Sequence, residues 1–538
     1  MAIKELLKSR IKNRAALSSF KRKIAKKYKI QCPSNIELLK AYHELLKKKR
    51  IKRLEEIEAL LKTRPIRSLS GIVNVSVLTK PYPCPGKCLY CPLEKGMPKS
   101  YLSGEPAAER AKRLKFNPYL QVKKRIEMLK NEGHPTDKID LRIIGGTWSF
   151  YPKKYRSWFI KRCFDACNEK TTTHPPPEGP KRKFGRVEGG SESRRRRAPG
   201  KNLNEAQKLN EIAKNRIIGI SVETRPDFIN EKEVKFMREL GITRVELGVQ
   251  SIFDNVLKLN LRGHGVRETI LATKILKDAG IKICYQMMPN LPGSNLKKDE
   301  KIFEEIFSNP DFQPDYLKIY PCALLKEAPL YKLYLKGKYK PYSKEELIDL
   351  IKKIKLKIPY YVRIQRITRD IPSKYIVEGG ARISNLRQIV QEEMKKEDLK
   401  CKCIRCREIR EKYEPKEKIC LFREDYEASG GKEIFLSFEN KTRRKLFSFL
   451  RLRISFSVLK NAAIIREIQT FGEVVPIGEK KIAPQHRGLG KKLIKEAEII
   501  TKREFGLKNI SVISGVGVKN YWRKLGYKLK ETYMAKKI

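Results

Sequence analysis

Between Gly71 and Cys322 the chain alternates short apolar runs with amphipathic helical patterns. The helical patterns include EKEVKFMREL (231–240) and ETILATKILKDAG (268–280), and they separate runs that have the length of buried strands. The runs are 71–78, 139–146, 216–223, 244–249, 281–288 and 316–321. Repeated strand–helix units place the strands parallel to one another through right-handed crossovers. The pattern therefore predicts an α/β fold, a full or partial (β/α) barrel.

Polar and glycine residues stand where several of these strands end. The second run leads into Gly145-Gly146-Thr147, the third ends at Glu223 and is followed by Arg225, the fourth is followed by Gln250, and the last contains Tyr320. Barrel active sites form at the carboxyl ends of the strands. We therefore expect these residues to converge on one mouth.

Three cysteines, Cys84, Cys88 and Cys91, occupy the loop after the first run with the spacing C-x3-C-x2-C. Three thiolates can hold three irons of a 4Fe–4S cluster and leave the fourth iron open for S-adenosylmethionine, so the spacing is typical of radical chemistry. Structural zinc is the alternative, but it needs four ligands, and no fourth Cys or His stands nearby in the sequence. We favour the cluster.

A second cysteine group contains Cys401, Cys403 and Cys406. Three sulfurs within six residues suit a zinc knuckle with one ligand from elsewhere, for which Cys420 is our candidate. A second iron–sulfur cluster is the alternative. We favour zinc, because no strand and no barrel mouth surround this group.

The net charge constrains the partners of this protein. The chain has 120 Lys and Arg against 61 Asp and Glu, a formal charge of +59, which favours an anionic partner such as nucleic acid over a membrane surface. No apolar run approaches the length of about 18 residues that a membrane span requires, and the N-terminus lacks a signal-peptide core. Cysteines concentrated in two groups predict metal binding in a reducing cytoplasm.

Composition also predicts four segments. Residues 1–65 are basic with helical periodicity, which favours a helical RNA-binding region over a solvated cap, and residues 66–357 hold the predicted barrel. Within the barrel, 171–201 is rich in Pro, Gly, Ser and Arg, which predicts a flexible insertion. Residues 358–425 are interpreted as a linker with the zinc cysteines, and 426–538 as a separate α+β domain.

The C-terminal domain carries its own motif. Strands are expected at 434–438, 445–452 and 462–469, followed by Gln485-His486-Arg487-Gly488-Leu489-Gly490-Lys491 at the start of a helix. A glycine turn at a helix N-terminus presents free backbone N–H groups to an anion such as pyrophosphate. In this setting Q/R-x-x-G-x-G/A is the acetyl-CoA signature of Gcn5-related N-acetyltransferases, and NYWRKLGY (520–527) resembles the usual ending of that fold.

A radical S-adenosylmethionine barrel followed by an acetyltransferase domain resembles the catalytic subunit family of Elongator, in an archaeal-type single chain. The resemblance runs from about residue 64 to 538. Its most specific stretches are SGEP (103–106), NPYLQ (117–121), VETRPD (222–227), RVELGVQS (244–251), MMPNLPG (287–293), KIYP (318–321), YEASGGKEIFLSFE (426–439) and ISVISGVGVKNYWRKLGY (510–527).

The resemblance implies a tRNA uridine acetyltransferase. In that family a radical derived from S-adenosylmethionine activates the methyl group of acetyl-CoA, which adds to C5 of the wobble uridine of tRNA and is hydrolysed to 5-carboxymethyluridine. Cys84, Cys88 and Cys91 match the cluster ligands, and Lys318 and Tyr320 match the active-site KIY motif. The implied cofactor-binding residues are Lys138, Gly145, Gly146, Thr147, Glu223, Arg225, Gln250, Glu467, Ile468, Gln469, Thr470, Gln485, Gly488, Leu489, Gly490, Lys491, Tyr521 and Trp522.

Some residues depart from the family pattern. Gln469-Thr470 stands where many members have His-Val, and Trp522 replaces the more usual Tyr. The main alternative function is a lysine acetyltransferase with a structural metal-binding barrel. A non-catalytic RNA scaffold and a radical methylthiotransferase are less favoured, because the cluster and acetyl-CoA motifs are intact. The sequence leaves open whether two copies form a homodimer.

Overall fold

The computed structural model describes residues 2–9, 11, 13–48, 50–169, 201–410, 414, 416–455, 461–472 and 487–538. Of the predicted insertion at 171–201, only Lys201 belongs to these residues. The predicted acetyl-CoA residue Gln485 also lies outside the described residues.

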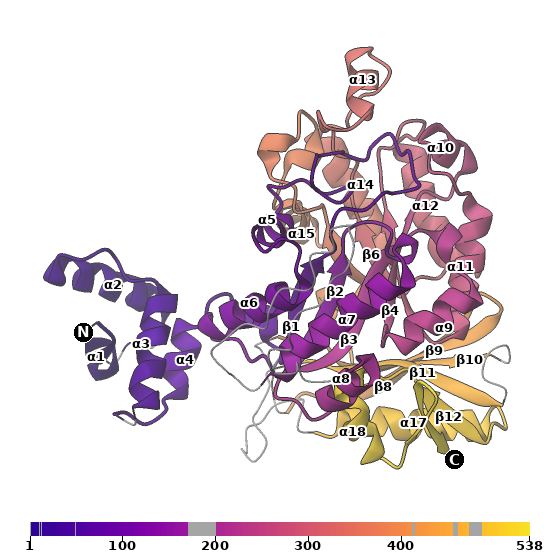
Figure 1. The fold of residues 1–538 in the computed structure, drawn as a ribbon. Helices are drawn as coiled ribbons and strands as arrows, with labels where there is room; N and C mark the ends of the chain where they lie inside the picture. Colours follow the sequence, from indigo (N-terminus) through magenta and orange to yellow (C-terminus); the bar gives the residue numbers. More distant parts are fainter. Residues whose placement is uncertain are drawn as a thin grey trace, which may run out of the picture.

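Seven parallel strands form the first sheet, in the order of the sequence (Figure 1). The strands are β1 (Ile72–Leu78), β2 (Lys138–Ile144), β3 (Arg216–Thr224), β4 (Arg244–Gln250), β5 (Lys282–Met287), β6 (Tyr316–Ile319) and β7 (Arg363–Ile367). Because β1 and β7 are the two edges of this sheet, the barrel is open on one side. The predicted partial (β/α) barrel is therefore confirmed.

Helices connect these strands and cover the outer face of the barrel (Figure 1). They include α5 (Pro106–Arg113), α6 (Pro118–Asn131), α7 (Lys153–Asn168), α8 (Leu203–Asn210), α9 (Glu231–Glu239), α10 (Asp254–Leu259), α11 (Val266–Asp278), α12 (Leu296–Ser308), α13 (Leu330–Leu335), α14 (Lys344–Lys357) and α15 (Leu386–Lys396). Local chemistry determines where they begin: the Ser343 side chain caps α14, and Glu346 bonds back to the Ser343 amide.

The barrel extends beyond its predicted end at residue 357. Strand β7 lies in the segment 358–425 that was interpreted as a linker, and it pairs with β6 through Leu317 and Ile364. The sequence RIQRI contains only two isoleucines among polar residues, so it has no apolar run of the kind that marked the other strands. Its identity as a strand is set by pairing with β6.

The second sheet also has seven strands, in the order β13-β14-β12-β11-β10-β9-β8. Its strands are β8 (Ile419–Ala428), β9 (Gly431–Asn440), β10 (Leu446–Ile454), β11 (Ala462–Thr470), β12 (Asn509–Val512), β13 (Lys528–Lys530) and β14 (Tyr533–Lys537). Strands β11 and β12 are parallel, and the other neighbours are antiparallel. Since β8 begins at Ile419, this sheet starts before the predicted boundary at 426. Helix α17 (Leu489–Arg503) packs on this sheet.

The second sheet lies across the amino ends of the barrel strands, below the barrel in Figure 1. A Cβ atom added to Gly515, just after β12, would lie 1.9 Å from the carbonyl oxygen of Ile218 in β3. This contact leaves no room for any other residue at position 515. The two sheets therefore pack closely against each other.

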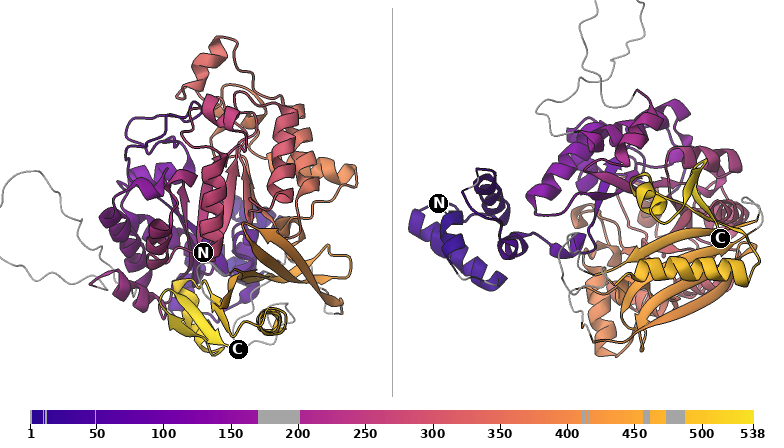
Figure 2. Two further views of the ribbon diagram at one scale, coloured as in Figure 1. Left: turned by 90° about the vertical axis from the view of Figure 1, so that its right-hand side faces the viewer. Right: turned by 90° about the horizontal axis from the view of Figure 1, so that it is seen from below.

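The N-terminal helices form a small unit beside α6, set apart from both sheets (Figure 2). They are α1 (Ala2–Lys8), α2 (Arg14–Tyr28), α3 (Asn35–Lys47) and α4 (Glu55–Leu61), as the periodicity predicted. Leu6, Leu39, Tyr42 and Leu61 are fully buried in a core of their own. Within the described residues, no helix is both long and apolar enough to cross a membrane.

Candidate active site

The cysteine loop lies at the carboxyl end of β1, at the mouth of the barrel. The Cys84 sulfur is 3.9 Å from the Thr147 hydroxyl, and Arg262 Nη1 donates to the Cys88 sulfur at 3.5 Å. A Cβ atom on Gly86 would lie 3.4 Å from the Cys88 sulfur and 3.8 Å from the Cys84 sulfur. The loop thus folds around one small volume that these sulfurs border.

Charges around this loop suit an electron-rich group. Burial, with a smaller contribution from the neighbouring Cys88 thiolate, raises the pKa of Cys91 to about 11. Burial also opposes ionisation of Cys88, but the Arg262 guanidinium outweighs it and lowers the pKa of that thiol. Arg225 Nη1 is buried and has no hydrogen-bond partner within the described structure. Three thiolates beside two guanidinium groups fit a 4Fe–4S cluster, whose ligands must be deprotonated.

Two glycines after β2 complete this side of the mouth. Gly145 and Gly146 have φ angles of +132° and +99°, which strongly favour glycine. A Cβ atom on Gly145 would lie 2.0 Å from the Thr79 hydroxyl oxygen. Position 145 therefore requires glycine, whose carbonyl oxygen accepts hydrogen bonds from the hydroxyls of Thr79 and Tyr151. Contact of this turn with the amino-acid end of S-adenosylmethionine stays a prediction.

Lys318 of β6 projects into the barrel, where it pairs with Glu246 of β4 and lies 3.5 Å from Glu223 of β3. Burial opposes the charge on Lys318, but Glu246, Tyr320 and Glu223 together outweigh it and raise the pKa of the ammonium group. Tyr101 donates to Glu223 at 2.7 Å, and the Lys318 ammonium lies 5.7 Å from the centre of the Tyr320 ring. Glu246 and Tyr101 were not predicted from the sequence as residues of this site. Glu246 could have been found as a carboxylate inside an otherwise apolar run, RVELGV.

Gln250 ends β4 in a left-handed conformation, with φ of +71°. Its side chain is buried, and the side-chain oxygen Oε1 has no hydrogen-bond partner among the described residues. A buried polar atom without a partner and a strained backbone are features that cluster at binding sites. This geometry supports Gln250 as a ligand-facing residue.

A single cavity of about 880 Å³ connects the barrel mouth to the second sheet. Tyr90 and Tyr101 line it at the mouth, Lys318 lines its middle, and Ile468 and Gln469 line it at the second sheet. Residues of the barrel and of β11, more than 100 residues apart in the sequence, therefore line one cavity.

The glycine motif after β11 lies beside this cavity. Gly488 has φ of +68° and precedes α17, and a Cβ atom on Gly490 would lie 3.6 Å from Thr470 Oγ1 and 3.9 Å from the Tyr521 hydroxyl. Tyr521 is 39% exposed, whereas Trp522 is 3% exposed and packs edge-on against Tyr527. The structure thus brings Thr470, Gly490 and Tyr521 together around the N-terminus of α17, and it places most of the Trp522 side chain in the core.

The remaining residues predicted to bind acetyl-CoA differ in their exposure and in their contacts. Leu489 is the first residue of α17 and its side chain is buried, whereas Lys491 is exposed on the same helix. The Glu467 carboxylate accepts hydrogen bonds from Arg451 and from Tyr316 of the barrel, so it joins the two sheets. Lys138 begins β2, at the end of the barrel that faces the second sheet.

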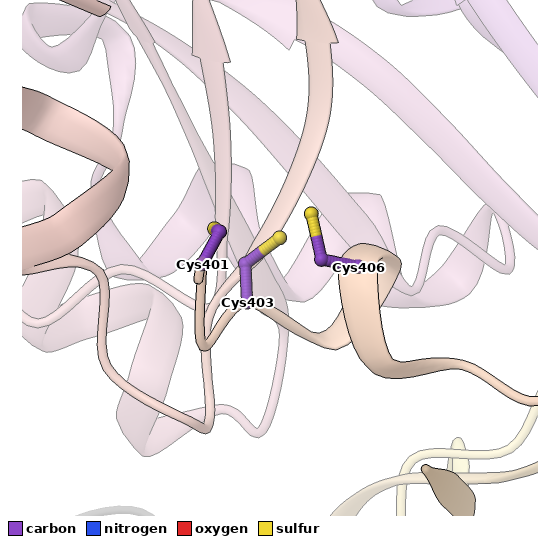
Figure 3. Close-up of side chains that lie close together, drawn as sticks. All are labelled: Cys401, Cys403 and Cys406. Carbon is purple, nitrogen blue, oxygen red and sulfur yellow. The ribbon is translucent and has the colours of Figure 1, made fainter. Parts of the chain in front are cut away.

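The second cysteine group does come together (Figure 3). The sulfurs of Cys401, Cys403 and Cys406 all lie within 4.8 Å of one another, and Lys355 Nζ lies 3.5 Å from the Cys406 sulfur. Tetrahedral Zn–S bonds of about 2.3 Å place the sulfurs of one ion about 3.8 Å apart, so small side-chain shifts bring these three sulfurs onto a single ion. Cys420 does not join the group but lies in β8 opposite Glu439. The prediction of Cys420 as the fourth ligand was therefore wrong.

The position of Cys420 follows from the sheet to which it belongs. Cys420 is only 14 residues from Cys406 in sequence, but it belongs to the edge strand of the second sheet, whose register is set by β9. In the described part of the chain, no other His, Cys, Asp or Glu brings a ligand atom within 4.8 Å of all three sulfurs. Three thiolates are thus the donor set that this structure offers.

The parallel open barrel and its three-cysteine loop define a radical S-adenosylmethionine protein. The Radical SAM superfamily model matches residues 197–306, and the Radical_SAM C-terminal domain model matches residues 314–396. The chain is 45% identical to the tRNA uridine(34) acetyltransferase of Methanocaldococcus infernus over 94% of this chain and 92% of that protein. It is 37% identical to human Elongator complex protein 3 over 89% of this chain and 86% of that protein.

A solved structure agrees with these relatives. The archaeal Methanocaldococcus infernus Elp3 with an N-terminal deletion superimposes with a TM-score of 0.72 and 42% identity, over 87% of this chain and all of that one. The chain belongs to the family of tRNA uridine(34) acetyltransferases and Elongator complex protein 3. The resemblance inferred from the sequence motifs is therefore confirmed.

Proposed function

We propose that this enzyme is a tRNA uridine(34) acetyltransferase that uses S-adenosylmethionine and acetyl-CoA to form 5-carboxymethyluridine at the wobble position. The carrying observation is the cavity of about 880 Å³, which is lined by Gln250 and Lys318 of the barrel and by Glu467, Ile468 and Gln469 of the second sheet. A reaction that joins a radical from one cofactor to an acyl group from another needs both to meet without exposure to bulk water. A connected internal space supports that requirement.

Cys84, Cys88 and Cys91 would hold the 4Fe–4S cluster, with Gly145, Gly146 and Thr147 against the amino-acid end of S-adenosylmethionine. Such a cluster would supply one-electron reduction chemistry for the cleavage of S-adenosylmethionine at this mouth. The guanidinium group of Arg262, which donates to the Cys88 sulfur, would offset part of the negative charge of the thiolates.

Lys318 supplies a fixed positive charge on the cavity wall. Glu246 and Glu223 hold its ammonium group from two neighbouring strands, which restricts its position. In this place the ammonium can donate to the carbonyl oxygen of a thioester or to the carboxylate of the product, with Tyr320 beside it. Lys318 and Tyr320 are therefore our candidates for catalytic residues.

The acetyl-CoA site would use the backbone of Glu467–Thr470 on β11 and the N–H groups at the start of α17. Gly488 and Gly490 leave this turn without side chains, so a pyrophosphate can approach the helix N-terminus. Tyr521 is exposed beside Gly490, and the largely buried Trp522 lines the cavity, so both aromatic side chains are candidates for the contact with acetyl-CoA. The Cys401–Cys406 group would hold structural zinc, with an exogenous fourth ligand.

The proposed partners follow from the same chemistry. Anionic tRNA matches the formal charge of +59. The twelve cysteines of the chain are all free, which supports a reducing compartment, and we place the enzyme in the cytoplasm.

Mass spectrometry of tRNA nucleosides tests the proposed function. The anaerobically reconstituted enzyme is incubated with tRNA, acetyl-CoA, S-adenosylmethionine and a reductant, and 5-carboxymethyluridine is the expected product. Cys88→Ala should abolish the product and lower the bound iron, while circular dichroism stays unchanged. Acetylation of lysine peptides at equal rates by both proteins, without any modified uridine, would favour the lysine acetyltransferase instead.

A further inference from the structure

A row of aromatic side chains runs outward from the cysteine loop along the first turns of α7. Tyr82 stacks on Tyr151 with ring centres 4.8 Å apart, Tyr151 stacks on Tyr155 at 5.1 Å, and the ring of Trp158 follows at 5.7 Å. Phe150 adjoins the inner end, with its ring 5.9 Å from that of Tyr82. We call these five residues the aromatic row.

The aromatic row begins at the barrel mouth itself. The Tyr151 hydroxyl donates to the carbonyl of Lys80, four residues before Cys84, at 2.8 Å. Cys84 in turn lies 3.9 Å from Thr147, which directly precedes the turn that carries Phe150. The row is therefore anchored to both loops that form the radical site.

Free ring surface remains at the two ends of the row. Trp158 is 42% exposed and Phe150 is 36% exposed, and within the described residues Tyr521 is the only other aromatic side chain in the exposed class. Two of the three exposed aromatic side chains thus lie in one row beside the mouth. A core function does not account for them, because the core of this region is formed by buried neighbours such as Phe159.

Positive charge accompanies the rings. Lys80 holds its ammonium 5.1 Å from the Tyr155 ring centre, and Lys153 and Lys154 are exposed at the start of α7. The carboxylates nearby are neutralised, since Asp227 pairs with Arg225 and Glu233 pairs with Arg156. Aromatic faces with adjacent lysines are the chemistry that binds unpaired nucleotides, by base stacking and phosphate contact.

We propose that the aromatic row binds unpaired nucleotides that flank the target uridine, with a base stacked on Trp158 and another on Phe150. The inference rests on the proposed function, since it assumes an RNA substrate, and it adds where the loop nucleotides lie. A uridine that enters the barrel must leave its stack, so its neighbours need new stacking partners at the rim. The row provides such partners next to the cysteine loop.

Equilibrium binding of RNA tests this inference without reference to catalysis. The probe is a fluorescently labelled RNA hairpin with an anticodon-type loop, compared with the same stem closed by an abasic loop. Trp158→Ala and Phe150→Ala should each weaken binding of the intact loop by roughly tenfold, as expected for the loss of one base–aromatic stack. Trp158→Phe, which keeps a ring, should recover most of the affinity. Leu271→Ala, 54% exposed on α11, is the control and should bind as the parent does.

Salt dependence separates stacking from charge. Trp158→Ala should leave the slope of log affinity against log salt unchanged, whereas Lys153→Ala with Lys154→Ala should reduce it, because phosphate contacts are lost. The inference is overturned if Trp158→Ala binds the intact loop like the parent protein. It is also overturned if Trp158→Ala weakens binding of the abasic hairpin as much as binding of the intact loop. The same holds if that variant weakens binding of S-adenosylmethionine and leaves RNA binding unchanged. If the parent protein binds neither hairpin, the proposed function itself fails.

Discussion

Arg466 of β11 and Asp315, the residue before β6, form a bidentate ion pair between the second sheet and the barrel. Nη1 and Nη2 of Arg466 donate to the two carboxylate oxygens of Asp315 at 2.9 and 2.6 Å, and neither side chain is exposed. Arg466 also pairs with Glu433 at 2.9 Å, and Lys277 lies 3.5 Å from Glu433. The barrel and the second sheet, whose residues together line the cavity, are therefore joined by buried charges.

Breaking this ion pair should destabilise the protein strongly. Arg466→Met leaves Asp315 and Glu433 buried with fewer counter-charges, and the loss of one partner from a buried pair costs roughly 3–5 kcal/mol. Urea denaturation would measure the change. Lys353→Met, which breaks the exposed pair with Asp349, is the control and should change stability by less than about 1 kcal/mol. A midpoint for Arg466→Met equal to that of Lys353→Met would contradict this role.

The same network predicts sensitivity to acid. Burial opposes ionisation of Asp315, but Arg466, Lys277 and Arg451 outweigh it and hold the pKa of Asp315 well below its ordinary value of about 4. A lowered native pKa adds stability that is complete above the unfolded value and is lost as the pH falls toward the native value. Thermal stability should thus fall as the pH decreases below about 4, and this acid dependence should shrink in Asp315→Asn. An unaltered pH profile in that variant would assign the acid sensitivity to other carboxylates.

Gly490→Ala should separate stability from acetyl-CoA binding. The added methyl group would meet Thr470, Ile468 and Tyr521 at ordinary contact distances of 3.6–3.9 Å, so the fold accepts it. Alanine also favours the helix, by up to about 1 kcal/mol. The methyl group would nevertheless occupy the space over the α17 N-terminus, so calorimetry should find weaker acetyl-CoA binding with unchanged or higher melting temperature. Lys495→Ala, on the exposed side of α17, should alter neither. Equal affinities in both variants would place acetyl-CoA elsewhere.

Metal analysis should distinguish the cysteines of the second group. Cys403→Ala removes one of three converging sulfurs, and zinc content and melting temperature should both fall. Cys420→Ala should retain the metal, because Cys420 lies in β8 outside the group. Loss of zinc from Cys420→Ala would mean that the strand moves when metal binds.

Short-range patterns were sufficient for most of the barrel. Strands β1 to β6 and the helices between them were predictable, because each strand has its own apolar run and each helix its own periodicity. Strand β7 was not, because RIQRI is polar enough to resemble a loop until β6 pairs with it. Glu246 was missed for the opposite reason: it is a single carboxylate in an apolar strand, and only the position of Lys318 gives it a function.

The candidate sites divide in the same way. Spacing alone was enough to predict Cys84, Cys88 and Cys91, the glycines after β2 and those at the start of α17, since each motif is local in the sequence. Which aromatic residue faces the acetyl-CoA turn could not be decided between Tyr521 and Trp522, because adjacent residues differ only in the direction that the fold assigns to them. Cys420 does not join the other three cysteines, because it lies in β8, the edge strand of the second sheet, although it is close to them in sequence.

The amino-acid sequence by itself determined the chemistry of this protein: the sulfur ligands, the glycine turns and the strand–helix order are local properties of the chain. Only the tertiary structure decided that Lys318 of the barrel and Gln469 of the second sheet line one cavity. That outcome depends on charges such as Arg466 and Asp315, 151 residues apart, meeting in a buried interface. Periodicity and spacing carry no information at that range, because contacts between distant segments are set by the packing of whole sheets.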